Sequence, residues 1–226
     1  MGKEIRLDIA GTTYREDVIV SLSTHRKLFD GAPSVGNCCC GELNCTLTIP
    51  TEDIPRNAKF VPYVSDDGQT WVKKGEYFVF SREVDKVTGW VSIVAYDAIF
   101  RASAYFASAG DQGQWPRTDI TVMQQIATRT GATINANTLT AMNKAYPVQY
   151  PGIVLENGSQ KIDGSGALTM RDVAGRIASY YGGNWIIDNN GEWRLILFGN
   201  ALGDADYLVT ENHEIIVMGG VRILVR

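Results

Sequence analysis

The sequence predicts an α+β protein that is mainly β. We expect an antiparallel β-barrel-like domain, then a small α/β domain with two helices, then the start of a further β domain. Two observations favour this class. In the first half of the chain apolar residues alternate with polar ones, the period of a strand with one buried face. In two later segments apolar residues recur every four positions, as on one side of a helix.

The first strands are predicted from this alternation. Residues 5–10 alternate, Gly11 and Thr12 form a turn, and residues 17–23 form a second strand with one apolar face made by Val18, Val20 and Leu22. Residues 41–49 alternate through Leu43, Cys45, Leu47 and Ile49.

Three more runs complete the first domain. Residues 59–65 and 71–81 are rich in β-forming residues and flank Asp66-Asp67-Gly68, whose Asp-Gly step supplies the positive φ of a tight hairpin turn. Residues 89–95 alternate again, with Trp90, Ser92 and Val94 opposite Val91, Ile93 and Ala95. Residues 1–105 are therefore predicted to form one antiparallel barrel or sandwich.

The second domain is expected over residues 106–200. Residues 107–116 are small, polar and rich in glycine, which is typical of a linker or surface loop. Helices are expected near 119–130 and 170–181, with Thr118 and Thr169 as N-caps and a glycine past each end. Two helices with the same caps look alike, so we favour shared capping over an internal duplication. A hairpin around Asn190-Gly191 follows them.

The end of the chain reads as strands over residues 207–210 and 214–226. We expect residues 201–226 to begin a second β domain and the chain to be the N-terminal part of a longer protein. In that case the strand edge of residues 217–226 pairs with the first sheet, with a neighbouring subunit, or with residues further along.

Composition limits the function classes. The chain has 226 residues, of which 45% are apolar and 20% charged, and a net charge of −4. This is an ordinary globular composition, and it predicts no face for phosphate backbones, so we expect no sequence-specific nucleic acid partner. We also expect no stable membrane insertion and no secretion signal.

Four cysteines lie within eight residues and form the strongest local signal: Cys38, Cys39, Cys40 and Cys45. A zinc site commonly needs a second, distant pair of ligands, and His25 and His213 lie far away in the sequence. We interpret the cysteines as small, buried or half-buried thiols, with a disulfide or a metal as the alternative. No cofactor is expected, and replacing all four by Ser or Ala is expected to leave folding nearly intact.

No catalytic constellation is predicted. Ser165, between Gly164 and Gly166, resembles a nucleophile elbow, but no apolar strand leads into it, so we interpret it as a loop. Asp163 beside it is expected to be solvated. The pair Asp66 and Asp67 has the composition for acid–base chemistry but the position of turn residues.

The tryptophans are the candidates for a sugar-binding cleft. Four of them lie in or beside strand runs and are expected to pack in a core, namely Trp71, Trp90, Trp185 and Trp193. Trp115 is expected to be exposed and is the candidate contact residue.

An ordered set of segments resembles a known family. Ser34-Val35-Gly36-Asn37 is followed by a Glu-Leu strand, by Pro-Arg-Asn-Ala-Lys-Phe-Val-Pro-Tyr-Val from residue 55, and by a strand ending in Tyr96-Asp97-Ala98. Gly182-Gly183-Asn184-Trp185 and a hairpin come later. This set is similar to the N-terminal part of phage tail hub (baseplate hub, tail-associated) proteins, and it covers most of residues 33–200.

The resemblance implies a structural protein and not an enzyme. It implies a tail-tube-like first domain and a homotrimer that joins the tail tube to the distal tip and forms the channel for DNA. The implied partners are the tail tube, distal tail and tape measure proteins, and the implied location is the tip of a virion tail that is assembled in the cytoplasm of a bacterial host. The alternative is a carbohydrate-binding or cell-wall-hydrolase module of a tail-associated protein.

Overall fold

The computed structural model describes residues 3–106, 118–145 and 168–198, and four short strands within residues 206–225. Two compact units divide the chain, and each takes in segments that are distant in the sequence. Unit 1 comprises Met1–Lys27, Cys40–Phe100 and Ile187–Glu192; unit 2 comprises Leu28–Cys39, Arg101–Ile186 and Trp193–Arg226. The domain boundaries expected at residues 105 and 200 stay predictions.

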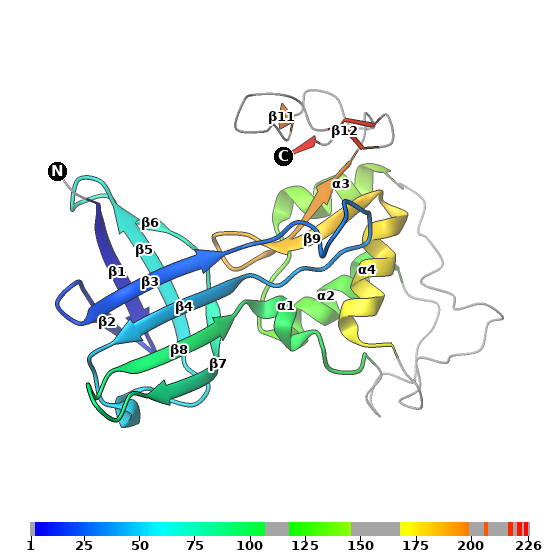
Figure 1. Ribbon diagram of the computed structural model, residues 1–226. Helices are drawn as coiled ribbons and strands as arrows, with labels where there is room; N and C mark the ends of the chain where they lie inside the picture. The colour runs from blue at the N-terminus through cyan, green and yellow to red at the C-terminus, as the bar shows by residue number, and fades with distance from the viewer. Residues whose placement is uncertain are drawn as a thin grey trace. The chain divides into compact units, whose positions relative to one another are not determined.

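Unit 1 is an antiparallel sheet that curls around one core (Figure 1). Along the sheet the strands follow the order β2-β1-β5-β7-β8-β4-β3, and β6 pairs with β5. Their bounds are β1 Glu4–Ile9, β2 Thr12–Tyr14, β3 Ile19–His25, β4 Glu42–Leu47, β5 Lys59–Ser65, β6 Val72–Lys73, β7 Tyr77–Val84 and β8 Val91–Tyr96. The mainly β, antiparallel part of the prediction is confirmed. The barrel is not, because the pairings form an open path that ends at β2 and β3.

The buried face of this sheet follows the predicted alternation. Leu43, Cys45 and Leu47 of β4 are each at most 3% exposed, and they meet Val91, Ile93 and Ala95 of β8 across the ladder. Leu7 and Ile9 of β1 and Phe60 of β5 join the same cluster. Strands with period two therefore share one apolar core, which burial of their inward side chains stabilises.

Two β-bulges shift the alternation where the sequence suggests none. In β3 the pairing passes from Ile19 to Ser21, so Ile19 and Leu22 pack against the core and Val20 points outward at 43% exposure. The predicted apolar face of Val18, Val20 and Leu22 is therefore wrong. In β7 the pairing passes from Val79 to Ser81, and Phe80 is 57% exposed. An extra residue on one strand shifts the alternation, so the side chains after the bulge point to the opposite face from the one that the sequence pattern predicts.

The connections in unit 1 also differ from the prediction. The turn between β1 and β2 uses Ala10 and Gly11, both at positive φ, and β2 was not expected as a strand. The run predicted over residues 71–81 is two strands, β6 and β7, separated at Gly75. The short 3-10 helix Thr51–Asp53 and helix α1 Ala98–Arg101 complete the unit's elements, although Arg101 itself belongs to unit 2.

The described part of unit 2 includes the helices α2 Asp119–Thr130, α3 Ala136–Ala145 and α4 Met170–Tyr180, and most of a hairpin formed by β9 Gly183–Ile187 and β10 Trp193–Leu197. The caps predicted for α2 and α4 are confirmed. Thr118 accepts a bond from the amide of Thr121, and Thr169 forms a capping box with Asp172. Helix α3 was not predicted.

The hairpin is bonded to each of the three helices. The indole N–H of Trp185 donates to the carbonyl of Ala174 in α4 at 2.9 Å, and that of Trp193 donates to Thr130 Oγ1 in α2 at 3.1 Å. The amide of Leu195 donates to Thr138 Oγ1 in α3 at 3.2 Å. Both rings are fully buried, so unit 2 combines aromatic burial with satisfied donors.

The four short strands near the end of the chain pair with one another: β11 Asp206–Tyr207 with β14 Leu224–Val225, and β12 Val217–Met218 with β13 Val221–Arg222. These described strands therefore pair with one another and not with the first sheet, whereas pairing of the final run with a neighbouring subunit stays a prediction. The sequence separation between β12 and β13 is short, and local pairing needs little loop closure.

Candidate functional site

Two of the segments that carry the family resemblance contain buried polar residues that hydrogen-bond to distant parts of the chain; we call each such contact a joint. Asn184 is fully buried; its amide group donates to the carbonyls of Leu28 and Ser34, each at 2.9 Å, and its Oδ1 accepts from the amide of Asn37 at 2.8 Å. Asn184 lies in β9, and the next residue, Trp185, forms a parallel bridge with Cys38. These residues hold the segment Leu28–Cys39 to β9 within unit 2, which explains why Ser34, Asn37 and Asn184 occur together.

A close glycine contact lies beside this joint. A Cβ added at Gly36 would lie 2.0 Å from Ser179 Oγ, and one added at Gly175 would lie 2.6 Å from the carbonyl oxygen of Gly36. Gly36 also has a φ of +86°, a conformation that other residues rarely adopt. Only glycine at these two positions lets the segment reach α4.

Asp97 forms a similar joint in unit 1. Its carboxylate accepts from the amide of Gly41 at 2.6 Å and from that of Ile99 at 3.0 Å, and the residue is 2% exposed. It therefore fixes the start of α1 against the entry of β4. The Tyr96-Asp97-Ala98 segment, like Ser34–Asn37, serves the fold.

Unit 2 has a hollow of about 410 Å³ beside α4. Its lining includes charged groups of both signs and two thiols: Asp30, Asp172, Arg171, Arg176, Cys38 and Cys39. Asp172 is already engaged, because its Oδ2 accepts from the amide and the hydroxyl of Thr169. Histidine is not among the lining residues that the structure describes, and the carboxylates there are those of Asp30 and Asp172.

The four cysteines divide between the units. Cys38 and Cys39 belong to unit 2, and Cys40 and Cys45 to unit 1. Burial raises the pKa of the Cys45 thiol to about 12, and burial likewise raises the pKa of Cys38 far above its ordinary range, although Arg171 opposes this. Thiols with raised pKa values stay protonated and are poor nucleophiles. Within the described residues, no group of three or more His, Cys, Asp or Glu side chains is placed to hold a metal ion.

Asp66 and Asp67 lie in the connection between β5 and β6, as predicted. Asp67 accepts from the amides of Gln69 and Thr70 at 2.8 and 2.6 Å and from the hydroxyl of Ser65 at 2.8 Å. The bond from the Thr70 amide and the others hold the pKa of the Asp67 carboxyl well below its usual range. An acceptor so occupied is a turn residue and a poor general base.

Other candidates lie outside the described residues: Trp115, Asp163, Ser165 and His213. His25 ends β3, opposite Glu42 of β4. Helices of the described part are all too short or too polar to cross a membrane.

The tryptophans divide into two kinds. Trp185 and Trp193 are buried, as predicted, with ring centroids 5.9 Å apart. The core position expected for Trp90 is wrong: it precedes Val91, so the alternation of β8 turns it outward, and it is 41% exposed. Trp71 is half-buried, with the guanidinium groups of Arg6 and Arg15 5.1 and 5.4 Å from its ring centroid.

An aromatic cluster lies outside the core of unit 1. We name Phe80, Tyr96 and Phe100 the outer aromatic cluster; their centroids are 4.9 to 5.3 Å apart. The bulge in β7 places Phe80 there, and the sequence pattern alone did not identify it. Val84, Val87 and Trp90 are exposed further along the same pair of strands and their connection. Grouped exposed apolar residues commonly mark a contact surface for another protein.

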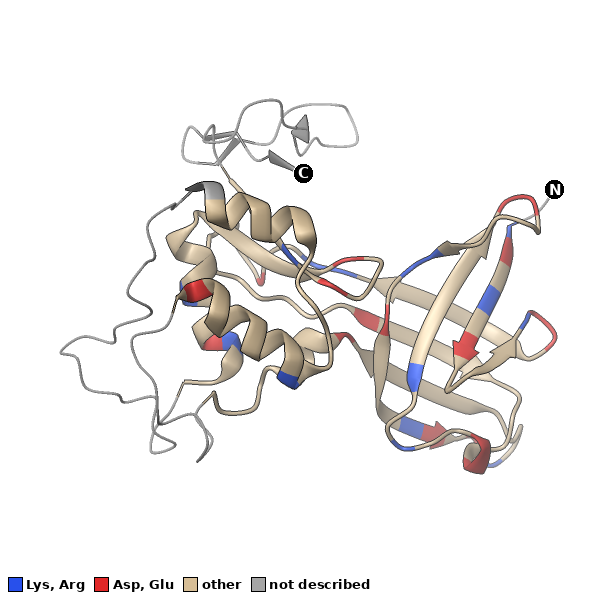
Figure 2. Ribbon diagram, turned by 180° about the vertical axis from the view of Figure 1, so that it is seen from behind, with Lys and Arg blue, Asp and Glu red and all other residues tan. Residues whose placement is uncertain are grey.

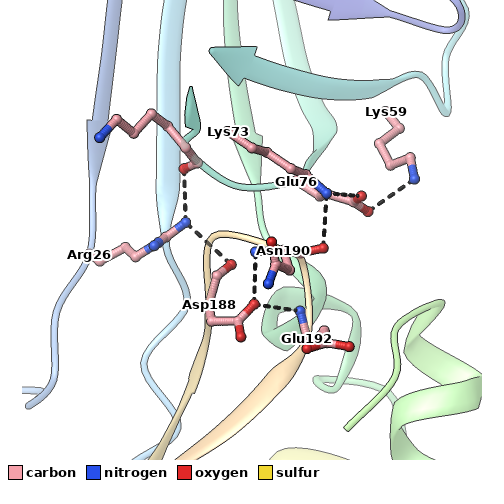
Figure 3. A network of polar contacts seen from close by, with 8 residues as sticks. Arg26, Lys59, Lys73, Glu76, Asp188, Asn190 and Glu192 are labelled. Atoms are coloured by element: carbon pink, nitrogen blue, oxygen red, sulfur yellow. Dashed lines mark hydrogen bonds and ion pairs between the residues drawn. The ribbon is translucent and has the colours of Figure 1, made fainter. Parts of the chain in front are cut away.

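Charges in unit 1 are mixed. Figure 2 shows Lys and Arg interspersed with Asp and Glu along the strands instead of gathered by sign. The ion pairs follow the same pattern: Glu76 accepts from Lys73 at 2.7 Å and from Lys59 at 2.9 Å, as Figure 3 shows. Burial disfavours the Glu76 carboxylate, but the bonds and charges of the two lysines outweigh it and lower its pKa.

Comparison with known proteins gives similarity at the level of fold. Neither a protein family nor a curated protein matches the chain. The 43 kDa tail protein of prophage MuSo2 from Shewanella oneidensis has a similar structure, with a TM-score of 0.52 and 14% identity over 92% of this chain and 59% of that one. A tail protein from Neisseria meningitidis MC58 aligns with a TM-score of 0.44 and 10% identity over 95% of this chain and 59% of that one. This chain thus spans about 59% of the length of either protein.

Proposed function

We propose that this chain is a structural component of a bacteriophage or prophage tail. The proposal rests on the agreement between a resemblance in sequence and a similarity in fold. An ordered set of sequence segments resembles tail hub proteins, and the fold is similar to that of a prophage tail protein across 92% of the chain. Those segments include the joints at Asn184 and Asp97, so the resemblance rests on residues that determine the fold.

The finer proposal is a hub at the tail tip or baseplate. In this role a homotrimer joins the tail tube to the distal tip and lines the channel through which DNA passes. Its partners are the tail tube and distal tail proteins and the tape measure protein, and it is assembled in the host cytoplasm. A closed ring of identical subunits uses one surface patch repeatedly, so each subunit needs a contact surface that is exposed in the free chain.

Unit 1 supplies such a surface. Phe80 is 57% exposed and Trp90 41%, and Val84 and Val87 are exposed on the same strands and their connection. We expect a neighbouring copy to cover these residues, because exposed apolar groups gain stability when another surface removes them from water.

The role we propose is not catalytic. Acyl or glycosyl transfer needs a nucleophile or an acid with a tuned pKa. Burial instead raises the pKa values of Cys38 and Cys45, and hydrogen bonds fix Asp67 as an ionised turn residue. These observations favour a structural protein over the cell-wall-hydrolase alternative.

Two measurements test the proposal. Mass spectrometry and imaging of tails from the phage or lysogen that encodes the chain should find it at the tail tip. Light scattering on residues 1–226 should give the mass of a trimer. A stable monomer that is absent from purified tails would contradict both levels of the proposal, whereas presence elsewhere in the tail would contradict only the hub assignment. A zymogram and a glycan array test the alternative, which clear lysis or tight glycan binding would favour.

A further inference from the structure

The turn Ile187–Glu192 is the shortest segment of unit 1 and comes from the most distant part of the sequence. We name its polar residues Asp188 to Glu192 the latch turn. Asp188 organises it: its Oδ1 accepts from the amides of Asn190 and Glu192 at 2.8 and 3.1 Å, and its backbone pairs with that of Glu192. Gly191 is at a φ of +86°, as this turn requires. The turn therefore has its shape from bonds within itself.

Two cations, Arg26 and Lys73, donate hydrogen bonds to the turn from the rest of unit 1 (Figure 3). Arg26 donates through Nη1 to Asn189 Oδ1 at 2.6 Å and through Nη2 to the carbonyl of Asp188 at 3.5 Å. Its Nη2 also donates to the carbonyl of Lys74 at 2.8 Å, which fixes the guanidinium beside β6. Lys73 donates to the carbonyl of Asn190 at 2.9 Å.

Lys73 is itself positioned by charge. Its ammonium lies 2.7 Å from Glu76 Oε1, and the ammonium of Lys59 lies 2.9 Å from Glu76 Oε2. Gly191 packs directly against Glu76, since a Cβ there would lie 2.8 Å from its carboxyl carbon. Lys59, Glu76 and Lys73 thus form a row of alternating charges, and Lys73 at its end donates to the backbone of the latch turn.

The apolar core of unit 1 takes no part in holding these residues. Its members come from the sheet strands and from residues 54 and 58, and none is drawn from the latch turn. Ion pairs and charged hydrogen bonds near the surface are individually weak and are screened by salt, unlike apolar burial. The turn is therefore held by a different force from the sheet that it joins.

We propose that the latch turn is a releasable element of unit 1, held closed by Arg26 and Lys73 and opened when their charges are screened or removed. The sheet keeps its fold when the latch turn leaves, because the core does not include it. This inference depends on the contacts within unit 1 and holds whether or not the chain is a tail protein.

Hydrogen exchange in residues 1–226 tests the proposal. The amides of Asn190, Gly191 and Glu192 bond within the turn and stay bonded when it is released, whereas Nη1 of Arg26 donates to Asn189 across the contact. Exchange of the Arg26 Nη1 protons therefore reports release of the latch turn, and amide exchange in β4 and β8 reports the sheet. In the variants below, the exchange compared is that of these Nη1 protons. Lys73→Met should speed their exchange by about tenfold, as expected when charged hydrogen bonds are lost, and leave β4 and β8 protected. Lys73→Arg should restore slow exchange. Lys86→Met is the matched control, since Lys86 is an exposed lysine between β7 and β8.

The salt dependence of exchange is a second, independent test. Raising the salt from roughly 0.05 M to 1 M should speed exchange of the Arg26 Nη1 protons in the natural chain and change it little in Lys73→Met. Equal exchange in Lys73→Met and Lys86→Met, or no response to salt, would overturn the proposal. If Lys73→Met loses protection in β4 and β8 as well, Glu76→Gln replaces it, and global loss in that variant too would show that the latch turn is part of the core fold.

Discussion

Two aromatic groups in this protein are built from similar rings and have different consequences. In unit 2, Trp185 and Trp193 are fully buried, and each indole N–H donates to a helix. In unit 1, the outer aromatic cluster has rings at a similar spacing, but Phe80 is 57% exposed. Ring-to-ring distance therefore does not distinguish a core from a contact surface. What distinguishes them is whether the rings are removed from water and whether their polar atoms are bonded inside.

The largest expected effect is in the tryptophan pair. Trp193→Ala should lower the free energy of unfolding by about 3–5 kcal/mol, because it leaves a large cavity and removes the donor to Thr130 Oγ1. Denaturant titration measures the change. Trp193→Phe keeps most of the ring and should cost less. A loss below roughly 1 kcal/mol for the alanine variant would contradict burial of this ring.

The next largest loss of stability is expected when the buried polar side chain of Asn184 in unit 2 is removed. Asn184→Ala leaves the carbonyls of Leu28 and Ser34 and the amide of Asn37 without their partner, at roughly 1–3 kcal/mol for each buried group that stays unpaired. Asn184→Asp is the informative companion, since it can still accept from Asn37 but cannot donate to the two carbonyls. Equal stability of the aspartate variant and the natural chain, in the same titration, would count against this network.

Substitutions of Cys45 test whether the core of unit 1 is apolar around this residue. The residue is 3% exposed among apolar side chains, so Cys45→Ser should destabilise the protein by about 1–3 kcal/mol through a buried hydroxyl. Cys45→Ala should cost less, because it leaves only a small cavity. Because Cys45 is buried, we expect alanine but not serine to replace it without a large loss of stability. Thermal unfolding of the two variants should show serine as the worse choice, and the reverse order would mean that a polar partner is present.

Acid should weaken unit 1 through Glu76. Because its pKa is lowered in the folded protein from the ordinary value of 4.5, the carboxylate contributes stability above that value. The contribution is lost as the pH falls through the lowered pKa. Stability measured at neutral and at acidic pH should therefore fall less in Glu76→Gln than in the natural chain. An identical acid dependence in both proteins would exclude this role.

The smallest effect on stability should come from the outer aromatic cluster. Phe80→Ser should change the free energy of unfolding by no more than about 0.5 kcal/mol, since the ring is already mostly in water. It should reduce self-association in light scattering if a neighbouring copy covers the cluster. A loss of stability comparable to that of Trp193→Ala would remove the distinction drawn between the two aromatic groups.

The sequence predicted what local periodicity determines. The alternation of β4 and β8 and the capped helices α2 and α4 depend on neighbouring residues, and they are present. The bulges at Val20 and Phe80 depend on the pairing of each strand with the strand that follows it, which the alternation within one strand does not reveal. Helix α3 has a weak apolar face in a segment followed by two prolines. The bond from Lys73 to Asn190 joins residues 117 positions apart, beyond the reach of any local pattern.

The interleaved segments also set an order in which the protein can form during synthesis. The strands β1 to β8 are complete once residue 96 has been made, so their sheet can form early. The segment Leu28–Cys39 must wait for Asn184, whose bond to Leu28 spans 156 positions. At a typical translation rate, the 88 residues between residues 96 and 184 take roughly 4 to 18 seconds to make. During that interval the nascent chain carries a finished sheet and the segment Leu28–Cys39 without its contacts to Asn184, which is the state that a chaperone or an early partner would meet.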